Sequence, residues 1–96
     1  MWIYEKRLQF PVNIKQPNAK MAQFIMSQYG GPDGEMGASM RYLSQRYAMP
    51  YKECKAALTD IGTEELAHLE IVAAIIHQIT RGLSAQELEE QGFGPY

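Results

Sequence analysis

The longest regular pattern of apolar positions lies between Pro50 and Gly82. Its period of three to four residues is that of one face of an α-helix, so the pattern predicts a long helix that begins after Pro50. Arg81 and Gly82 provide the basic residue and the glycine that are typical of a helix end. The apolar positions that carry the pattern are Leu58, Ile61, Leu66, Leu69, Val72, Ile75, Ile76 and Ile79.

The chain before Pro50 predicts helix in two segments, at about 18–30 and 32–48. Asn18 is a favourable N-cap for the first segment. Pro32 lies where the two segments meet, and a proline inside a helical pattern bends the helix because it lacks a backbone N–H. We therefore expect two nearly coaxial segments with a bend between them. The positions that share one helical line at about 100° per residue are Met21, Phe24, Gln28, Glu35 and Tyr42.

Shorter patterns mark the two ends of the chain. Ser84 and Glu87 form a capping box, which predicts a short helix over 85–90 that stops at Gly92. Residues 1–17 predict an extended arm, because apolar side chains alternate there until Pro11. We thus expect an all-α fold, in which an arm over 1–17 precedes a helical hairpin and a short C-terminal helix over 18–96. The alternating apolar residues are Trp2, Tyr4, Leu8 and Phe10.

Composition excludes several classes of function. Nine basic residues are offset by eleven acidic ones, so charge gives no argument for nucleic acid as a partner. The longest apolar run, 71–76, is too short to span a membrane. Charged residues at 5–7 occupy the place where a signal peptide needs apolar ones, and Cys54 is the single cysteine. We expect synthesis in a reducing cytoplasm, with no signal peptide and no membrane span.

The long helix carries an E-x-x-H pair, Glu65 and His68, in the middle of its apolar stripe. A buried carboxylate is costly unless it is paired or bound to a metal, so this placement favours a metal site. The alternative is a surface pair or a core histidine with its hydrogen bonds satisfied. Glu64 lies about 40° from His68 and is the competing carboxylate. His77 lies on the opposite side of the helix and should face outward.

A second carboxylate, Glu35, precedes the long helix in a segment rich in methionine and glycine. In one interpretation it stabilises a helix N-terminus as an acidic residue of the first turn. In the other, it matches di-metal carboxylate bundles, where some helices give one Glu and others give E-x-x-H. The glycines at 30, 31, 34 and 37 do not form a phosphate-loop signature, so nucleotide binding is rejected.

Several motifs resemble those of the manganese catalase family, and of its CotJC-type spore coat branch in particular. They are Glu35-Met36, Tyr42-Leu43-x-Gln45, the run from Ile61 to Glu70 (IGTEELAHLE), the opening WIYEKRLQFPV at 2–12, and the residues 17–20 and 28–35. The resemblance covers essentially the whole chain.

This resemblance implies a ferritin-like four-helix bundle with a dinuclear manganese centre that disproportionates hydrogen peroxide to water and dioxygen. By the family pattern, Glu35 and His68 would be terminal ligands of one metal and Glu65 would bridge the two metals. Tyr42 would donate a hydrogen bond to a ligand carboxylate. Carboxylate and imidazole ligands suit manganese, with iron as the alternative.

Family members take a further Glu and a further His from a second pair of helices, and this sequence lacks that second half. Either the chain is the N-terminal portion of a longer protein, or another copy completes the site. In the second case we expect a homodimer or a higher even oligomer with the site near a two-fold axis.

Three functions are compatible with these features. The first is a manganese-catalase-like peroxide dismutase of the spore coat, with weak or absent turnover in this short chain. The second is a structural spore-coat subunit whose metal is vestigial, with other coat proteins as partners. The third is a di-iron ferritin-like oxidase.

Overall fold

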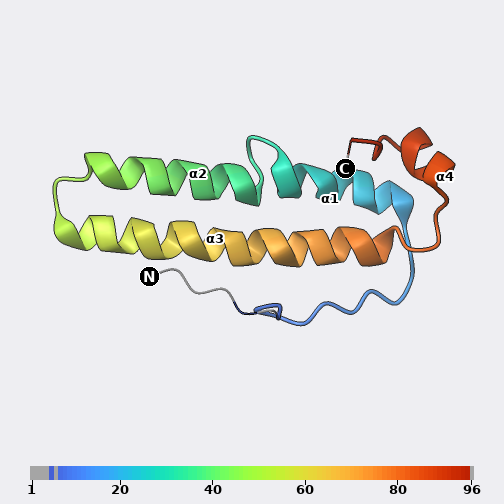
Figure 1. Ribbon diagram of the computed structural model, residues 1–96, viewed down its shortest axis with the longest axis horizontal. Coiled ribbons are helices and arrows are strands. Elements are labelled where there is room, and N and C mark those ends of the chain that lie inside the picture. The colour runs from blue at the N-terminus through green and yellow to red at the C-terminus, as the bar shows by residue number, and fades with distance from the viewer. Residues whose placement is uncertain (1–4, 6, 96) are drawn as a thin grey trace.

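The computed structural model describes residue 5 and residues 7–95, and this part is entirely helix, turn and irregular chain. Figure 1 shows α1 and α2 lying one after the other along one side of α3, while the N-terminal segment runs along another side of α3. The predicted all-α hairpin is confirmed. The helices are α1 (Ala19–Gly30), α2 (Glu35–Gln45), the 3₁₀ turn η1 (Arg46–Ala48), α3 (Lys52–Ile79) and α4 (Ala85–Glu90).

The first arm of the hairpin is interrupted between α1 and α2, where the sequence predicted only a bend. Gly31 is extended (φ −75°, ψ 171°), since the residue before a proline is driven out of the helical region. The N–H of Gly34 then donates to the carbonyl of Gly31 at 2.9 Å and closes a turn. The predicted division into two helical segments is therefore confirmed, but the second segment begins at Glu35 and not at residue 32. The predicted end at residue 48 is likewise replaced by α2 ending at Gln45, followed by η1.

The long helix α3 begins two residues after Pro50 and runs for 28 residues. Gly82 has a φ of 84°, a left-handed conformation that glycine adopts without steric cost. Arg81 donates to the carbonyl of Gln78, one of the last carbonyls of the helix. The predicted long helix and its glycine-containing end are confirmed.

Helices α2 and α3 approach closely at one small-residue contact. The hydroxyl of Ser39 donates to the carbonyl oxygen of Gly62 at 2.8 Å, and both residues are buried. A Cβ atom at Gly62 would lie 2.8 Å from Cδ2 of Leu43, which is closer than carbon atoms pack. The absent side chain thus lets the two helices meet along the middle of the hairpin.

The N-terminal segment is tied to the C-terminal half of α3 by polar contacts. The side chain of Gln78 donates to the carbonyl of Val12 at 2.9 Å and accepts from the N–H of Ile14 at 2.7 Å. Arg81 donates to the carbonyls of Ile14 and Lys15. Residues 7–17 contain no helix or strand. Trp2 and Tyr4, part of the pattern that predicted an arm, lie outside the described residues.

Little of the hairpin's apolar surface is enclosed by the described part of the chain. The buried apolar residues are Ala22, Ile79 and Phe93, which form one small cluster with the partly buried Ile14, Ile25, Met26 and Leu88 packed against it. Two packed helices cover only part of the apolar stripe of each, so this fold leaves large side chains for further helices to cover. The exposed large apolar residues of the helices include Met21, Phe24, Met36, Met40 and Ile61.

The short helix α4 has the predicted capping box. The hydroxyl of Ser84 accepts from the N–H of Glu87 at 3.1 Å, and the Glu87 carboxylate accepts from the N–H of Ser84. Gly92 follows the helix with a φ of 87°. Among the described helices, none has the length and apolar character needed to cross a bilayer.

Candidate metal centre

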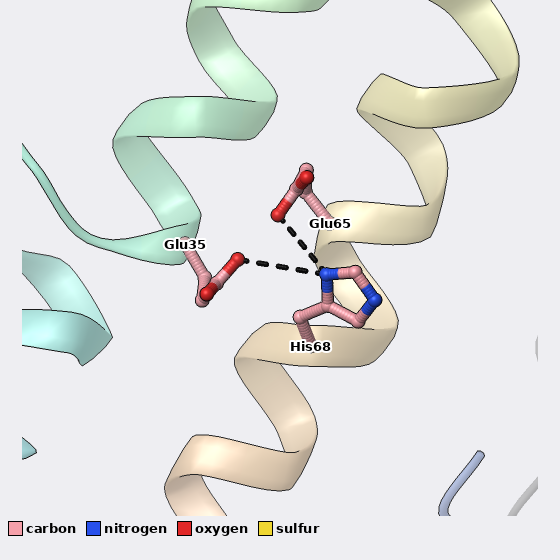
Figure 2. A group of neighbouring side chains, drawn as sticks. All are labelled: Glu35, Glu65 and His68. Carbon is pink, nitrogen blue, oxygen red and sulfur yellow. Dashed lines mark hydrogen bonds and ion pairs between the residues drawn. The ribbon is translucent and has the colours of Figure 1, made fainter.

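Glu35 opens helix α2 and points toward α3 (Figure 2). Gly34 precedes it as an N-cap without a side-chain hydrogen bond, so the acidic side chain stands at an uncapped helix N-terminus. The close turn at 31–34 decides where this N-terminus lies along α3. The Glu35 side chain is only 27% exposed, and in the described part of the chain its one basic neighbour is the imidazole of His68. Carboxylates are rarely this buried without a lysine or arginine partner.

Glu65 and His68 face Glu35 from the middle of α3. Nδ1 of His68 lies 3.1 Å from Oε2 of Glu65 and 3.6 Å from Oε2 of Glu35. The side chains of Glu65 and His68 are 14% and 36% exposed. In Figure 2 both carboxylates point to the same ring nitrogen. Three residues separated by up to 33 positions thus meet in one cluster.

The donor set of this cluster fits a divalent metal ion. One ligand atom from each of Glu35, Glu65 and His68 can be chosen so that all three lie within 4.8 Å of one another. Ligand atoms at about 2.1 Å from an ion lie about 3 Å apart at adjacent octahedral corners and about 4 Å apart at opposite ones. Two carboxylates with one imidazole are hard ligands of the kind that manganese and iron accept.

The two carboxylates perturb one another. Hydrogen bonding between them raises the pKa of Glu35, with burial as the second cause, and lowers the pKa of Glu65. Two neighbouring carboxylates disfavour each other's ionisation, so Glu35 keeps a proton to higher pH than Glu65 does. A divalent cation placed between them would remove the repulsion that a proton relieves in the metal-free chain.

Glu64, the competing carboxylate, takes a different position from Glu65. It is 47% exposed, and its Oε1 lies 3.9 Å from the other ring nitrogen of His68, Nε2. The same oxygen accepts a hydrogen bond from Gln9 at 3.1 Å. Sequence reasoning missed Gln9, because no periodicity relates two residues 55 positions apart. His77 is exposed, as its helical phase predicted.

Tyr42 lies two turns after Glu35 on α2 and is half-buried. Tyr42 is not among the groups that shift the pKa of Glu35 or the pKa of Glu65. The hydrogen bond expected from Tyr42 to a ligand carboxylate is absent from the described part of the chain, and that role stays a prediction.

A family model described as manganese containing catalase matches residues 1–93. The chain belongs to the manganese catalase family. It is 47% identical to the protein CotJC of Bacillus subtilis over 96 residues, which are all of this chain and 50% of CotJC. It is 33% identical to a manganese catalase of Lactiplantibacillus plantarum, over 99% of this chain and 33% of that enzyme.

A solved structure shares the fold as well. The crystal structure of KatB, a manganese catalase from Anabaena, superposes with a TM-score of 0.80 and 34% identity over 86% of this chain and 38% of KatB. The fold of this chain is therefore a ferritin-like hairpin, half of a four-helix bundle. The chain spans about half the length of CotJC and about a third of the catalases.

Proposed function

We propose that this chain provides one half of a dinuclear manganese site that disproportionates hydrogen peroxide. The observation that carries the proposal is the cluster of Glu35, Glu65 and His68, whose ligand atoms converge from two helices of a manganese catalase fold. When bound, a manganese pair supplies the two-electron chemistry by which one peroxide is oxidised to dioxygen and a second is reduced to water. Iron is the alternative metal, and it would favour a ferritin-like oxidase.

Each residue has a role in this proposal. Glu35 and His68 would hold one metal, and Glu65, the least exposed of the three, would be the carboxylate shared with the second metal. Tyr42 orients a ligand carboxylate through its hydroxyl once the rest of the bundle is in place. The donors already lie close together without metal, so little rearrangement is needed for binding.

The second half of the site comes, in this proposal, from another copy of the chain. Ile61 lies one turn before Glu65 and is 44% exposed, so the face that carries the cluster is uncovered. A two-fold related copy would cover it and bring a second Glu35, Glu65 and His68. The sum is four carboxylates and two imidazoles, the ligand set of symmetric di-metal bundles.

Sedimentation velocity of the purified chain with Mn²⁺ tests the assembly. We expect a dimer or a higher even oligomer, and a His68→Ala variant should dissociate more readily because the shared metal is lost. A wild-type chain that stays monomeric while it binds Mn²⁺ would contradict the shared site and favour coverage by further helices of a longer polypeptide.

We also propose that the protein works in the spore coat, on the strength of its similarity to CotJC along the whole chain. A structural coat subunit is the second candidate, on the same similarity to CotJC. Oxygen evolution from hydrogen peroxide, measured together with manganese and iron content, separates the two. The enzyme proposal predicts metal-dependent oxygen release, and the structural proposal predicts none.

A further inference from the structure

His68 has a carboxylate on each side of its ring. Nδ1 faces Glu65 and Glu35, whereas Nε2 faces Oε1 of Glu64 at 3.9 Å. A neutral imidazole carries one N–H. In the metal-free chain Glu65, at 3.1 Å, attracts that proton to Nδ1, whereas the Glu64 carboxylate near Nε2 favours the tautomer with the proton on Nε2. This tautomer leaves the lone pair of Nδ1 free for a metal ion, as in the carboxylate–histidine–metal arrangements of many metal sites.

Glu64 is in turn held by the N-terminal segment. Nε2 of Gln9 donates to Oε1 of Glu64 at 3.1 Å, and this is the same oxygen that faces His68. The segment is anchored separately, farther along α3, by Gln78 and Arg81. The chain three to six residues after Gln9 is therefore anchored by contacts that do not involve the metal cluster.

We propose that Glu64 and Gln9 are positioning residues for the metal ligand His68. The 3.9 Å separation exceeds a hydrogen bond, and a small rotation of the exposed Glu64 side chain closes it while Gln9 limits the rotamers that Glu64 can adopt. Through this pair the N-terminal segment controls metal affinity at a site to which it gives no ligand. The inference rests on the proposed metal site, and one of its two tests needs no metal.

The metal-free test measures the tautomer of His68. Nitrogen-15 NMR of the ring nitrogens, at a pH where the ring is neutral, should show more Nε2–H in the wild-type chain than in Glu64→Ala. Glu64→Gln keeps an oxygen acceptor without the charge and should retain most of the Nε2–H form. A tautomer ratio unchanged in Glu64→Ala would overturn the proposal, since a merely structural role for Glu64 does not affect the ring proton.

The second test is the dissociation constant for Mn²⁺. Loss of a residue that orients a ligand typically weakens metal binding by about 10- to 100-fold, and we expect this for Glu64→Ala. Gln9→Ala should weaken binding less, and should have no further effect when Glu64 is already alanine. Asp60→Ala removes a carboxylate one turn earlier on the same helix and controls for charge.

Gln16→Ala is the matched control for Gln9, because Gln16 is an exposed amide of the same segment. Equal Mn²⁺ affinity in Glu64→Ala and Asp60→Ala, or equal effects of Gln9→Ala and Gln16→Ala, would overturn the inference. If the wild-type chain binds no Mn²⁺, the proposed function fails, and the tautomer measurement still decides whether Glu64 positions the ring.

Discussion

Ser39 donates its hydroxyl hydrogen to the carbonyl oxygen of Gly62 across the α2–α3 interface, at 2.8 Å. Ser39 lies one turn after Glu35, and Gly62 lies three residues before Glu65. This single buried bond therefore sets the register that brings the two carboxylates opposite one another. A shift of either helix by one turn, about 5.4 Å, would separate them beyond the reach of a shared metal ion.

Replacement of this serine tests the role of the register bond. We expect Ser39→Ala to lower the free energy of unfolding by about 1 kcal/mol, the usual net value of one hydrogen bond, and to weaken Mn²⁺ binding. Ser44→Ala is the control, because Ser44 is an exposed serine of the same helix. Chemical denaturation and Mn²⁺ titration of both variants provide the measurement. Equal behaviour of the two would show that this bond does not set the register.

The tight turn between α1 and α2 gives a second prediction. A Cβ atom at Gly34 would lie 2.8–2.9 Å from backbone atoms of Ser27 and Gln28, which cannot move aside as a side chain can. Gly34→Ala should therefore destabilise the chain by about 1–3 kcal/mol. Gly30→Ala, where a Cβ meets nothing within 4 Å, should be neutral or slightly stabilising. Thermal unfolding of both variants measures the contrast, and similar melting temperatures would refute the close packing.

The opposite pKa shifts of Glu35 and Glu65 predict a pH dependence of stability in the metal-free chain. Because folding raises the pKa of Glu35 above 4.5, its ordinary value, the folded state favours the protonated form. The stability gained below that value is lost as pH rises through the raised pKa. Glu65 acts in the opposite sense, since its lowered pKa contributes stability above 4.5 that is lost on acidification. Among the described residues, the other titratable side chains near these two carboxylates are Glu64 and His68.

Glu35→Gln isolates the contribution of Glu35, because glutamine resembles the protonated carboxyl group. Relative to the wild-type chain in chelator, the variant should gain stability as pH rises from about 4.5 toward neutrality. Added Mn²⁺ should reverse the order, since only the wild type then has a charged ligand to offer. Parallel stability curves for the two proteins across this range would argue against a raised pKa of Glu35.

Peroxide turnover should be slow in the chain as it stands. A symmetric pair of hairpins surrounds two metals with four carboxylates and two imidazoles, which leaves fewer open positions for peroxide than an asymmetric site. We expect oxygen evolution that depends on added Mn²⁺ and is well below that of a full-length family member such as KatB, assayed in parallel. Equal rates per metal pair would show that a symmetric pair of hairpins is as effective as the asymmetric site.

The sequence predicted most of the helical fold, because its signals are local. The apolar period of α3 and the Ser84 capping box depend on neighbours within a few positions, and both are confirmed. The bend near Pro32 was predicted but the length of the interruption at 31–34 was not, because helical phase is preserved across it although Gly31 becomes extended.

The candidate site shows the same division between local and distant information. Helical phase alone placed Glu65 and His68 on one face and His77 on the other. Helical phase does not specify how the imidazole ring is rotated about its side-chain bonds. The approach of Nε2 to Glu64 was therefore not predicted. The contact between Gln9 and Glu64 depends on how the N-terminal segment packs along α3, which no pattern in the sequence specifies.

The most direct test of the central claim is the metal content of protein purified without chelator, measured for the wild type and three variants. The proposed centre predicts about one manganese per chain in the wild type and in His77→Ala, whose imidazole is exposed and outside the cluster. Glu65→Ala and His68→Ala should contain almost none. Wild-type protein without metal that also fails to bind added Mn²⁺, or equal metal loss from His77→Ala, would contradict the assignment of Glu35, Glu65 and His68 as ligands.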